Sequence, residues 1–160
     1  MTLDSIFWIA SCTKMITGVA CMQLVEQGKL SLDDPAQVEK LCPELKEVKI
    51  LQPDGSLVAK NRGISLRMLL THTAGFGYTF FHEGLRDHSK PVGYDEFSGH
   101  LSDVIQPLVH QPGEGWQYGV SPVSIFDHHE NLLTCRPGEH RLGWVLRRTY
   151  HQTVIERYVR

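Results

Sequence analysis

Ser11 and Lys14, a serine and a lysine three positions apart, are the residues of this chain best suited to nucleophilic chemistry. Residues three apart on a helix share one face, so the pair could place a nucleophile beside a base. A serine hydroxyl is a poor nucleophile until a neighbour takes its proton, and Lys14 could do so if partial burial favoured its neutral amine. The first N–H groups of such a helix are unpaired, so an oxyanion formed beside Ser11 would be stabilised there.

The elements that must position this pair follow from the apolar pattern. The run Ile6–Ala10 predicts a strand, and residues 15–28 predict a helix that ends at Gly28. The residues at helical spacing are Ile16, Val19, Ala20, Leu24 and Gln27. Ser11 is therefore expected where a strand gives way to a helix. A simpler explanation stays open, because serine is a favoured helix N-cap and this Ser–Lys spacing is common by chance.

Three later segments follow the pair, at residues 28–35, 64–77 and 111–119. The second contains Leu69-Leu70-Thr71-His72-Thr73-Ala74-Gly75, and the third contains Pro112-Gly113-Glu114 before Trp116 and Tyr118. In this order and at these separations, the segments resemble the β-lactamase-related serine hydrolases. That superfamily includes class C β-lactamases, penicillin-binding carboxypeptidases, and S-x-x-K esterases and transesterases. The resemblance covers residues 5–121 and points to the fungal branch that contains acyl-transferring esterases.

The resemblance implies a role for three residues. Ser11 would be the acylated nucleophile, Lys14 its proton acceptor, and Tyr118 the tyrosine that relays a proton to or from the leaving group. Tyr118 lies 107 positions after Ser11, so the fold would have to bring the two together. The alternative for Tyr118 is a half-buried aromatic whose hydroxyl is simply hydrated.

One departure from the family pattern bears on the substrate. The lactamase pattern reads Tyr-x-Asn, and the amide of that asparagine contacts the β-lactam side chain, whereas this chain has Val120 two positions after Tyr118. An apolar side chain would leave the substrate amide unpaired, which carries a desolvation penalty. Ester or thioester acyl groups are therefore expected in place of β-lactams.

A second departure concerns completeness. Family members carry a third motif on a late strand, a Lys-Thr-Gly or His-x-Gly-like element whose N–H completes the oxyanion hole. His140-Arg141-Leu142-Gly143-Trp144 is superficially similar, but it follows Tyr118 by only 22 positions. The resemblance thus implies a truncated α+β domain of the β-lactamase/transpeptidase type, with the helical part retained and most of the antiparallel sheet missing.

Residue usage changes near the same place. Residues 1–121 contain ten Lys and Arg against fourteen Asp and Glu, whereas residues 122–160 contain six Arg, no Lys and four acids. We interpret residues 1–121 as a partial hydrolase domain and residues 122–160 as an atypical tail of doubtful origin, such as a shifted frame, a retained intron or a mispredicted gene end. The alternative is a solvated basic tail, whose small positive charge is too weak to predict nucleic-acid binding.

Two functions follow as expectations. The first is a serine hydrolase or acyltransferase that forms an acyl-serine intermediate on a small-molecule ester or thioester and is impaired by truncation. The second is a catalytically inactive fragment, or a binding or regulatory remnant, of such an enzyme. The missing third motif is the feature that separates them.

Composition limits the remaining possibilities. With 160 residues, 41% of them hydrophobic, and a net charge of −2, the chain could form one domain. No segment has the length of a transmembrane helix or the pattern of a signal peptide, so no membrane partner is expected. The oligomeric state is left open. Four cysteines without C-x-x-C spacing are interpreted as reduced and buried, which favours a cytoplasmic protein. They are Cys12, Cys21, Cys42 and Cys135.

No metal or other cofactor is expected. His128, His129, Cys135 and His140 match no standard zinc spacing, and His72 is interpreted as a hydrogen-bonded structural histidine.

The rest of the chain predicts short elements. Asp34 and Pro35 predict a helix start, and Ser65 predicts the cap of a helix through Leu70. Residues 48–51 and 56–59 flank Pro53-Asp54-Gly55, which indicates a β-hairpin. From residue 72 to residue 91 the sequence has little periodicity, and its aromatic residues could line an acyl pocket or simply cover the core. They are Phe76, Tyr78, Phe80, Phe81 and, with them, His82.

Overall fold

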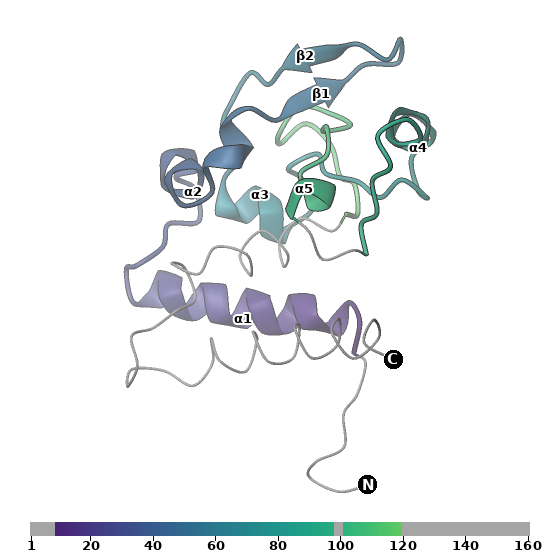
Figure 1. The fold of residues 1–160 in the computed structure, drawn as a ribbon. Coiled ribbons are helices and arrows are strands. Elements are labelled where there is room, and N and C mark those ends of the chain that lie inside the picture. Colours follow the sequence, from purple (N-terminus) through teal and green to yellow (C-terminus); the bar gives the residue numbers. More distant parts are fainter. Residues whose placement is uncertain (1–8, 98–100, 120–160) are drawn as a thin grey trace, which may run out of the picture.

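The computed structural model describes residues 9–97 and 101–119 (Figure 1). Helix α1, Cys12–Glu26, lies along one side, and the short helix α3, Leu66–Leu70, lies between α1 and the hairpin of β1 and β2. The other elements are α2 (Pro35–Leu41), the 3-10 helix η1 (Pro43–Lys46), α4 (Glu83–Ser89) and α5 (Leu101–Val104). This mixture of helices and a small antiparallel sheet has the predicted α+β character.

Helix α1 ends where the sequence predicts. Gln27 is its C-cap, and Gly28 follows with φ 68°, a left-handed conformation that glycine adopts without steric cost. The Lys29 N–H then donates to the Leu24 carbonyl at 2.9 Å, which closes the helix end.

The start of α1 corrects two expectations. Ile9 and Ala10 form no strand, because Ala10 has φ 44° and begins the turn that leads into the helix; residues 6–8 of that predicted strand lie outside the described residues. The first N–H groups are also not unpaired. The Cys12 N–H donates to the Ile9 carbonyl at 3.0 Å and the Thr13 N–H donates to the Ala10 carbonyl at 3.1 Å.

The buried side of α1 follows the helical spacing only in part. Thr17, Ala20 and Cys21 are buried and Leu24 packs against the core, whereas Val19, at the same helical spacing as Ala20 and Leu24, is 52% exposed. Met15 and Met22 are also exposed. Apolar residues occur on almost every side of this helix, so its periodicity could not show which side packs against the core.

The two predicted caps are confirmed. The Asp34 carboxylate accepts a hydrogen bond from the Ala36 N–H at 2.9 Å, with Pro35 as the first residue of α2. The Ser65 hydroxyl accepts from the Met68 N–H at the start of α3. Side-chain oxygens here satisfy helix N–H groups that have no partner within the helix.

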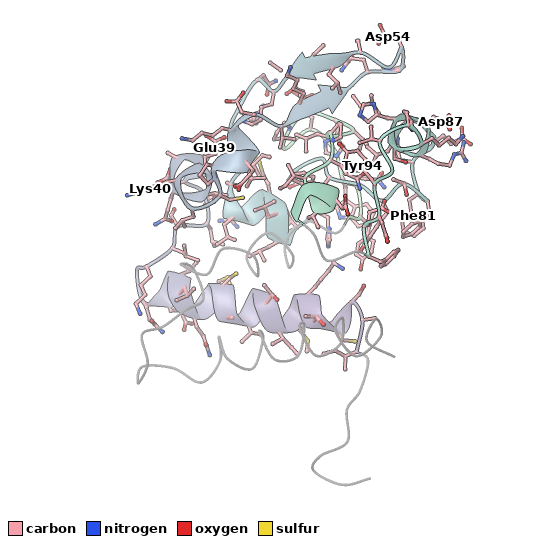
Figure 2. The ribbon with its side chains drawn as sticks, in the orientation of Figure 1. Glu39, Lys40, Asp54, Phe81, Asp87 and Tyr94 are labelled. Atoms are coloured by element: carbon pink, nitrogen blue, oxygen red, sulfur yellow. The ribbon has the colours of Figure 1, made fainter. Side chains whose placement is uncertain are left out.

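The predicted hairpin is also confirmed. Strands β1, Lys49–Leu51, and β2, Leu57–Ala59, pair antiparallel, with Asp54 at the outer tip of the turn (Figure 2). Strand β1 receives a second neighbour on its other edge, where the Leu51 N–H donates to the Leu108 carbonyl and the Leu108 N–H donates to the Lys49 carbonyl, both at 2.8 Å. This contact attaches the segment that follows α5 to the hairpin.

Helix α4 was not predicted from the sequence, because residues 72–91 show little periodicity. It has only seven residues, and its N-cap is His82, whose Nδ1 accepts from the Leu85 N–H at 3.2 Å. A histidine cap lies outside the usual set of serine, threonine, aspartate and asparagine. So short a helix offers little periodicity of its own.

The core gathers around α3. Leu66 and Leu69 are buried as predicted, and Leu70 is partly buried against them. The same apolar cluster includes Ala74, Phe76 and Leu108, which lie in or next to the two chain segments that position the site described below.

Replacing Leu69 tests this core. Leu69 is fully buried, so Leu69→Ala should lower the free energy of unfolding by about 2–5 kcal/mol, because it removes buried apolar contacts and leaves a cavity. Leu57→Ala removes the same atoms from a side chain that is 42% exposed and should cost about 0.5 kcal/mol. Urea unfolding followed by circular dichroism measures both, and equal losses in the two variants would contradict this core.

Candidate active site

The three residues singled out in the sequence meet at the start of α1. The Tyr118 hydroxyl donates a hydrogen bond to Ser11 Oγ at 2.8 Å, and Lys14 Nζ donates to the same oxygen at 3.3 Å. Lys14 Nζ also lies 5.0 Å from the centre of the Tyr118 ring, within the range of a cation–π contact. Ser11 Oγ is therefore contacted by two groups that can exchange protons with it.

Ser11 occupies the N-cap position of α1, but its side chain does not act as a cap. Its backbone is in the right-handed helical region, with φ −66° and ψ −11°, and its hydroxyl makes no capping hydrogen bond. An N-cap serine normally has an extended backbone that lets its oxygen reach the N–H groups of the first turn. The hydroxyl of Ser11 is directed instead to Lys14 and Tyr118, and the side chain is exposed.

Tyr118 reaches Ser11 because two segments far apart in the sequence pair through their backbones. The Val109 N–H donates to the Gly75 carbonyl at 2.8 Å, and the Gly113 N–H donates to the Thr73 carbonyl at 2.8 Å. We call residues 72–77 the inner segment and residues 109–119 the outer segment. Pairing along their length fixes the position of the outer segment, and with it the residue that carries the phenol.

The end of the outer segment is packed so closely that only glycine fits. A Cβ atom placed on Gly119 would lie 2.6 Å from the Phe76 carbonyl oxygen and 3.1 Å from the Gly77 nitrogen, both backbone atoms. Backbone atoms cannot move aside as the end of a flexible side chain can. The residue directly after Tyr118 therefore has to be glycine for the backbone to lie against the inner segment.

The surroundings change the acidity of two groups. The hydrogen bond to Ser11 lowers the pKa of Tyr118, and Lys14 lowers it further through a hydrogen bond and its positive charge, while partial burial acts in the opposite direction. Burial lowers the pKa of His72, and the positive charge of Lys14 lowers it further. The site thus favours a neutral imidazole at His72 and lowers the pKa of the neighbouring Tyr118 phenol.

An aromatic cluster adjoins the phenol. The Tyr78 ring lies 5.8 Å from the Tyr118 ring and stacks on Phe80 at 4.7 Å, and Phe81 lies 4.5 Å from Phe80. Phe97, which the sequence analysis did not single out, stacks on Tyr78 at 6.3 Å. Tyr78 is buried, but Phe80, Phe81 and Phe97 are each more than half exposed, and Figure 2 shows Phe81 pointing outward.

The cysteine prediction holds in part. Cys21 and Cys42 are free and buried, and burial raises the pKa of the Cys21 thiol to about 11. Burial, with the neighbouring Glu44 carboxylate, raises the pKa of the Cys42 thiol to about 12. Cys12 was expected to be buried but is exposed, because it lies in the first turn of α1 beside Ser11. Cys135 lies outside the described residues.

The described residues contain no group of three or more His, Cys, Asp or Glu side chains that could hold a metal ion. The histidine cluster considered at residues 128–140, the third-motif candidate at residues 140–144, and Val120 lie outside them. No helix within residues 9–97 and 101–119 is long and apolar enough to cross a membrane.

Comparison with known families now identifies the class of protein. Residues 1–128 match the protein-family profile described as Beta-lactamase. This chain belongs to the beta-lactamase family, as the resemblance implied, and its fold is of that type.

Curated relatives and a solved structure agree with this assignment. The acyltransferase calJ of Penicillium decumbens is 38% identical over 125 residues, which cover 74% of this chain and 29% of that protein. Lovastatin esterase of Penicillium rubens is 35% identical over 131 residues, 73% of this chain and 31% of that one. Unliganded simvastatin synthase (LovD) of Aspergillus terreus, as its selenomethionyl derivative, aligns with a TM-score of 0.66 at 31% identity, covering 81% of this chain and 33% of that chain. The chain thus spans about a third of the length of these relatives.

Replacing Gly119 tests how Tyr118 is positioned. In Gly119→Ala the new methyl group would displace the outer segment, so Tyr118 should lose its contact with Ser11 and its pKa should rise toward that of an ordinary tyrosine. Phenolate absorbance measured against pH, with Tyr118→Phe as the baseline, isolates this residue. Gly18→Ala is the matched control, because a methyl group on Gly18 meets nothing within 4 Å. An unchanged Tyr118 titration in Gly119→Ala would show that the close packing is not what positions the phenol.

Proposed function

We propose that this site performs acyl transfer through an acyl-serine intermediate, as a serine hydrolase or transesterase. The observation that carries the proposal is the double contact at Ser11 Oγ, which lies within hydrogen-bond distance of both Lys14 Nζ and the Tyr118 hydroxyl. A nucleophile, a base and a proton relay are what nucleophilic catalysis at a carbonyl requires. The names of the relatives, acyltransferases and an esterase, support the same class of reaction.

The reaction would proceed in two halves. Lys14, in its neutral form, takes the proton of Ser11 Oγ as that oxygen attacks the carbonyl carbon of the substrate. The tetrahedral intermediate collapses, the bond to the leaving oxygen or sulfur breaks, and Tyr118 delivers a proton to that atom. In the second half, water or an alcohol gives its proton to the Tyr118 phenolate and attacks the carbonyl carbon of the acyl-serine. The bond to Ser11 Oγ then breaks, Lys14 returns the proton to that oxygen, and the acid or a new ester is released.

The substrate we propose is a small-molecule ester or thioester with an apolar portion. The exposed rings of Phe80, Phe81 and Phe97 continue from the Tyr118 ring through Tyr78, so an apolar group held there would extend toward Tyr118, which contacts Ser11. Aromatic surface of this kind is stabilised when an apolar ligand removes it from water. Among the relatives, one is named a monacolin J acid methylbutanoyltransferase, whose name describes the transfer of a small apolar acyl group.

We also propose that the chain works in the cytoplasm without a metal or other cofactor. The free thiols of Cys21 and Cys42 support a reducing compartment. The proposed chemistry needs no cofactor because the serine itself carries the acyl group.

Covalent labelling tests the nucleophile. A fluorophosphonate or a p-nitrophenyl ester should label Ser11, as found by peptide mass mapping, because Ser11 Oγ is exposed and contacts both proton-transfer groups. Ser11→Ala should abolish the label. Cys12→Ala is the matched control, because Cys12 is an exposed thiol one position away, and it should leave the label in place. A folded chain that takes no label at Ser11 would instead favour the second expectation, an inactive binding or regulatory remnant.

Removing the proton-transfer groups tests their roles. If the unlabelled chain hydrolyses the ester, Lys14→Ala and Tyr118→Phe should each lower kcat by roughly 10²- to 10⁴-fold with a much smaller change in KM. The unchanged fold is checked by circular dichroism, and Lys29→Ala, an exposed lysine outside the site, serves as the control. Near-normal turnover in Lys14→Ala would mean that another group accepts the serine proton.

A further inference from the structure

His72 has a strained backbone next to the site. It follows the C-cap of α3 and has φ 59°, in the left-handed region that a residue with a Cβ rarely occupies. Such a conformation persists only where the surrounding contacts enforce it. At His72 the N–H donates to the Leu69 carbonyl of α3 at 3.4 Å, and the other contacts involve the outer segment.

The contacts of His72 lie on both sides of Tyr118. Its carbonyl oxygen accepts a hydrogen bond from the Gln117 N–H at 3.0 Å, and its Nδ1 accepts from the Gly119 N–H at 3.4 Å. Its ring lies 4.7 Å from the Tyr118 ring and 6.3 Å from the Trp116 ring. One residue thus contacts the chain immediately before Tyr118, the chain immediately after it, and the Tyr118 ring itself.

We propose that His72 is a positioning residue for the reaction, which in its neutral form with Nδ1 unprotonated fixes Tyr118 against Ser11. The proposal rests on the proposed function for its catalytic consequence, but its structural part concerns only where the Tyr118 hydroxyl lies. Since Nδ1 accepts from a backbone N–H, the ring proton of neutral His72 is on Nε2. Protonation of the ring would put a proton on Nδ1, so that the Nδ1–H and the Gly119 N–H would face each other as two donors without an acceptor.

The charges around His72 favour this neutral form. The charged and titratable groups that face it are Lys14 on α1 and Tyr118 on the outer segment. Burial and the positive charge of Lys14 both disfavour an imidazolium at His72. The un-ionised phenol of Tyr118 adds no charge that would stabilise one. Because the pKa of His72 is lowered, the contact should be intact at neutral pH and be lost only as the pH falls below the ordinary range of histidine.

Two substitutions at His72 distinguish the effect of the acceptor atom from the effect of the ring's bulk. His72→Asn keeps an acceptor close to the backbone, tolerates a positive φ and cannot take up a proton in this range. His72→Phe keeps a ring but has no acceptor for the Gly119 N–H. The first readout is the rate of Ser11 labelling by a fluorophosphonate between pH 4.5 and 8, resolved into a maximal rate and a half-saturating concentration.

We expect His72→Phe to lower the maximal labelling rate by roughly 10²-fold with little change in the half-saturating concentration, since a small displacement of a proton-transfer group is enough for such a loss. His72→Asn should retain most of the rate and should lack the decline that the unmodified chain shows as His72 is protonated. Equal losses in the two variants, or an identical acid decline in His72→Asn, would overturn the proposal. If the His72→Phe variant does not fold, the proposal is decided by comparing the decline of the labelling rate at acid pH in His72→Asn with that in the unmodified chain.

The second readout does not depend on activity. The pKa of Tyr118, isolated by phenolate absorbance against Tyr118→Phe, should rise in His72→Phe and stay low in His72→Asn. If the unmodified chain takes no label at Ser11, the proposed function fails, but this titration still tests whether His72 positions the phenol. A low Tyr118 pKa in a folded His72→Phe would show that it does not.

Discussion

The pairing between the inner and outer segments is the constraint on which the site depends. Ser11 and Tyr118 are 107 positions apart, and a hydrogen bond between two exposed or half-buried side chains is too weak to order so much intervening chain. The order comes instead from backbone hydrogen bonds along the two segments and from the core beneath them. Leu69 and Leu108, both fully buried, belong to that core and lie next to the two segments in the sequence. The Tyr118–Ser11 contact is therefore a consequence of the fold.

Close approach of the two backbones explains why particular small residues are needed here. Gly75 has φ 102°, and a Cβ on it would lie 2.5 Å from the His110 carbonyl oxygen. Gly119, at the end of the outer segment, is restricted by close contact alone, because a Cβ on it would lie 2.6 Å from the Phe76 carbonyl oxygen. A glycine at each of these positions lets the segments meet without side chains between them. The glycine at position 75, which ends the Leu69–Gly75 phrase, is thus required by backbone geometry.

The sequence predicted the features that are decided locally. The helix end at Gly28, the cap at Asp34 and the turn around Asp54 each depend on residues within a few positions, and all are as predicted. On α1 the helical spacing was only a partial guide, because Ala20 is buried and Leu24 packs against the core while Val19 is exposed, and only tertiary packing decides which side is buried. The meeting of Tyr118 with Ser11 could not be derived from spacing at all, and it was anticipated only through the family resemblance. Phe97 was missed for the same reason, since its stacking on Tyr78 joins positions without a shared local pattern.

One positive charge connects the electrostatics of the site. The Lys14 ammonium stabilises an ionised phenol at Tyr118 and destabilises an imidazolium at His72, so it shifts the pKa of both groups downward. For Tyr118 this shift favours a form that can accept a proton. For His72 it favours the form whose Nδ1 can accept from the Gly119 N–H. A lysine three residues after Ser11 therefore affects Ser11, Tyr118 and His72 together. These effects are coupled, so removal of Lys14 should also change the acidity of Tyr118 and His72, in addition to removing the proposed base.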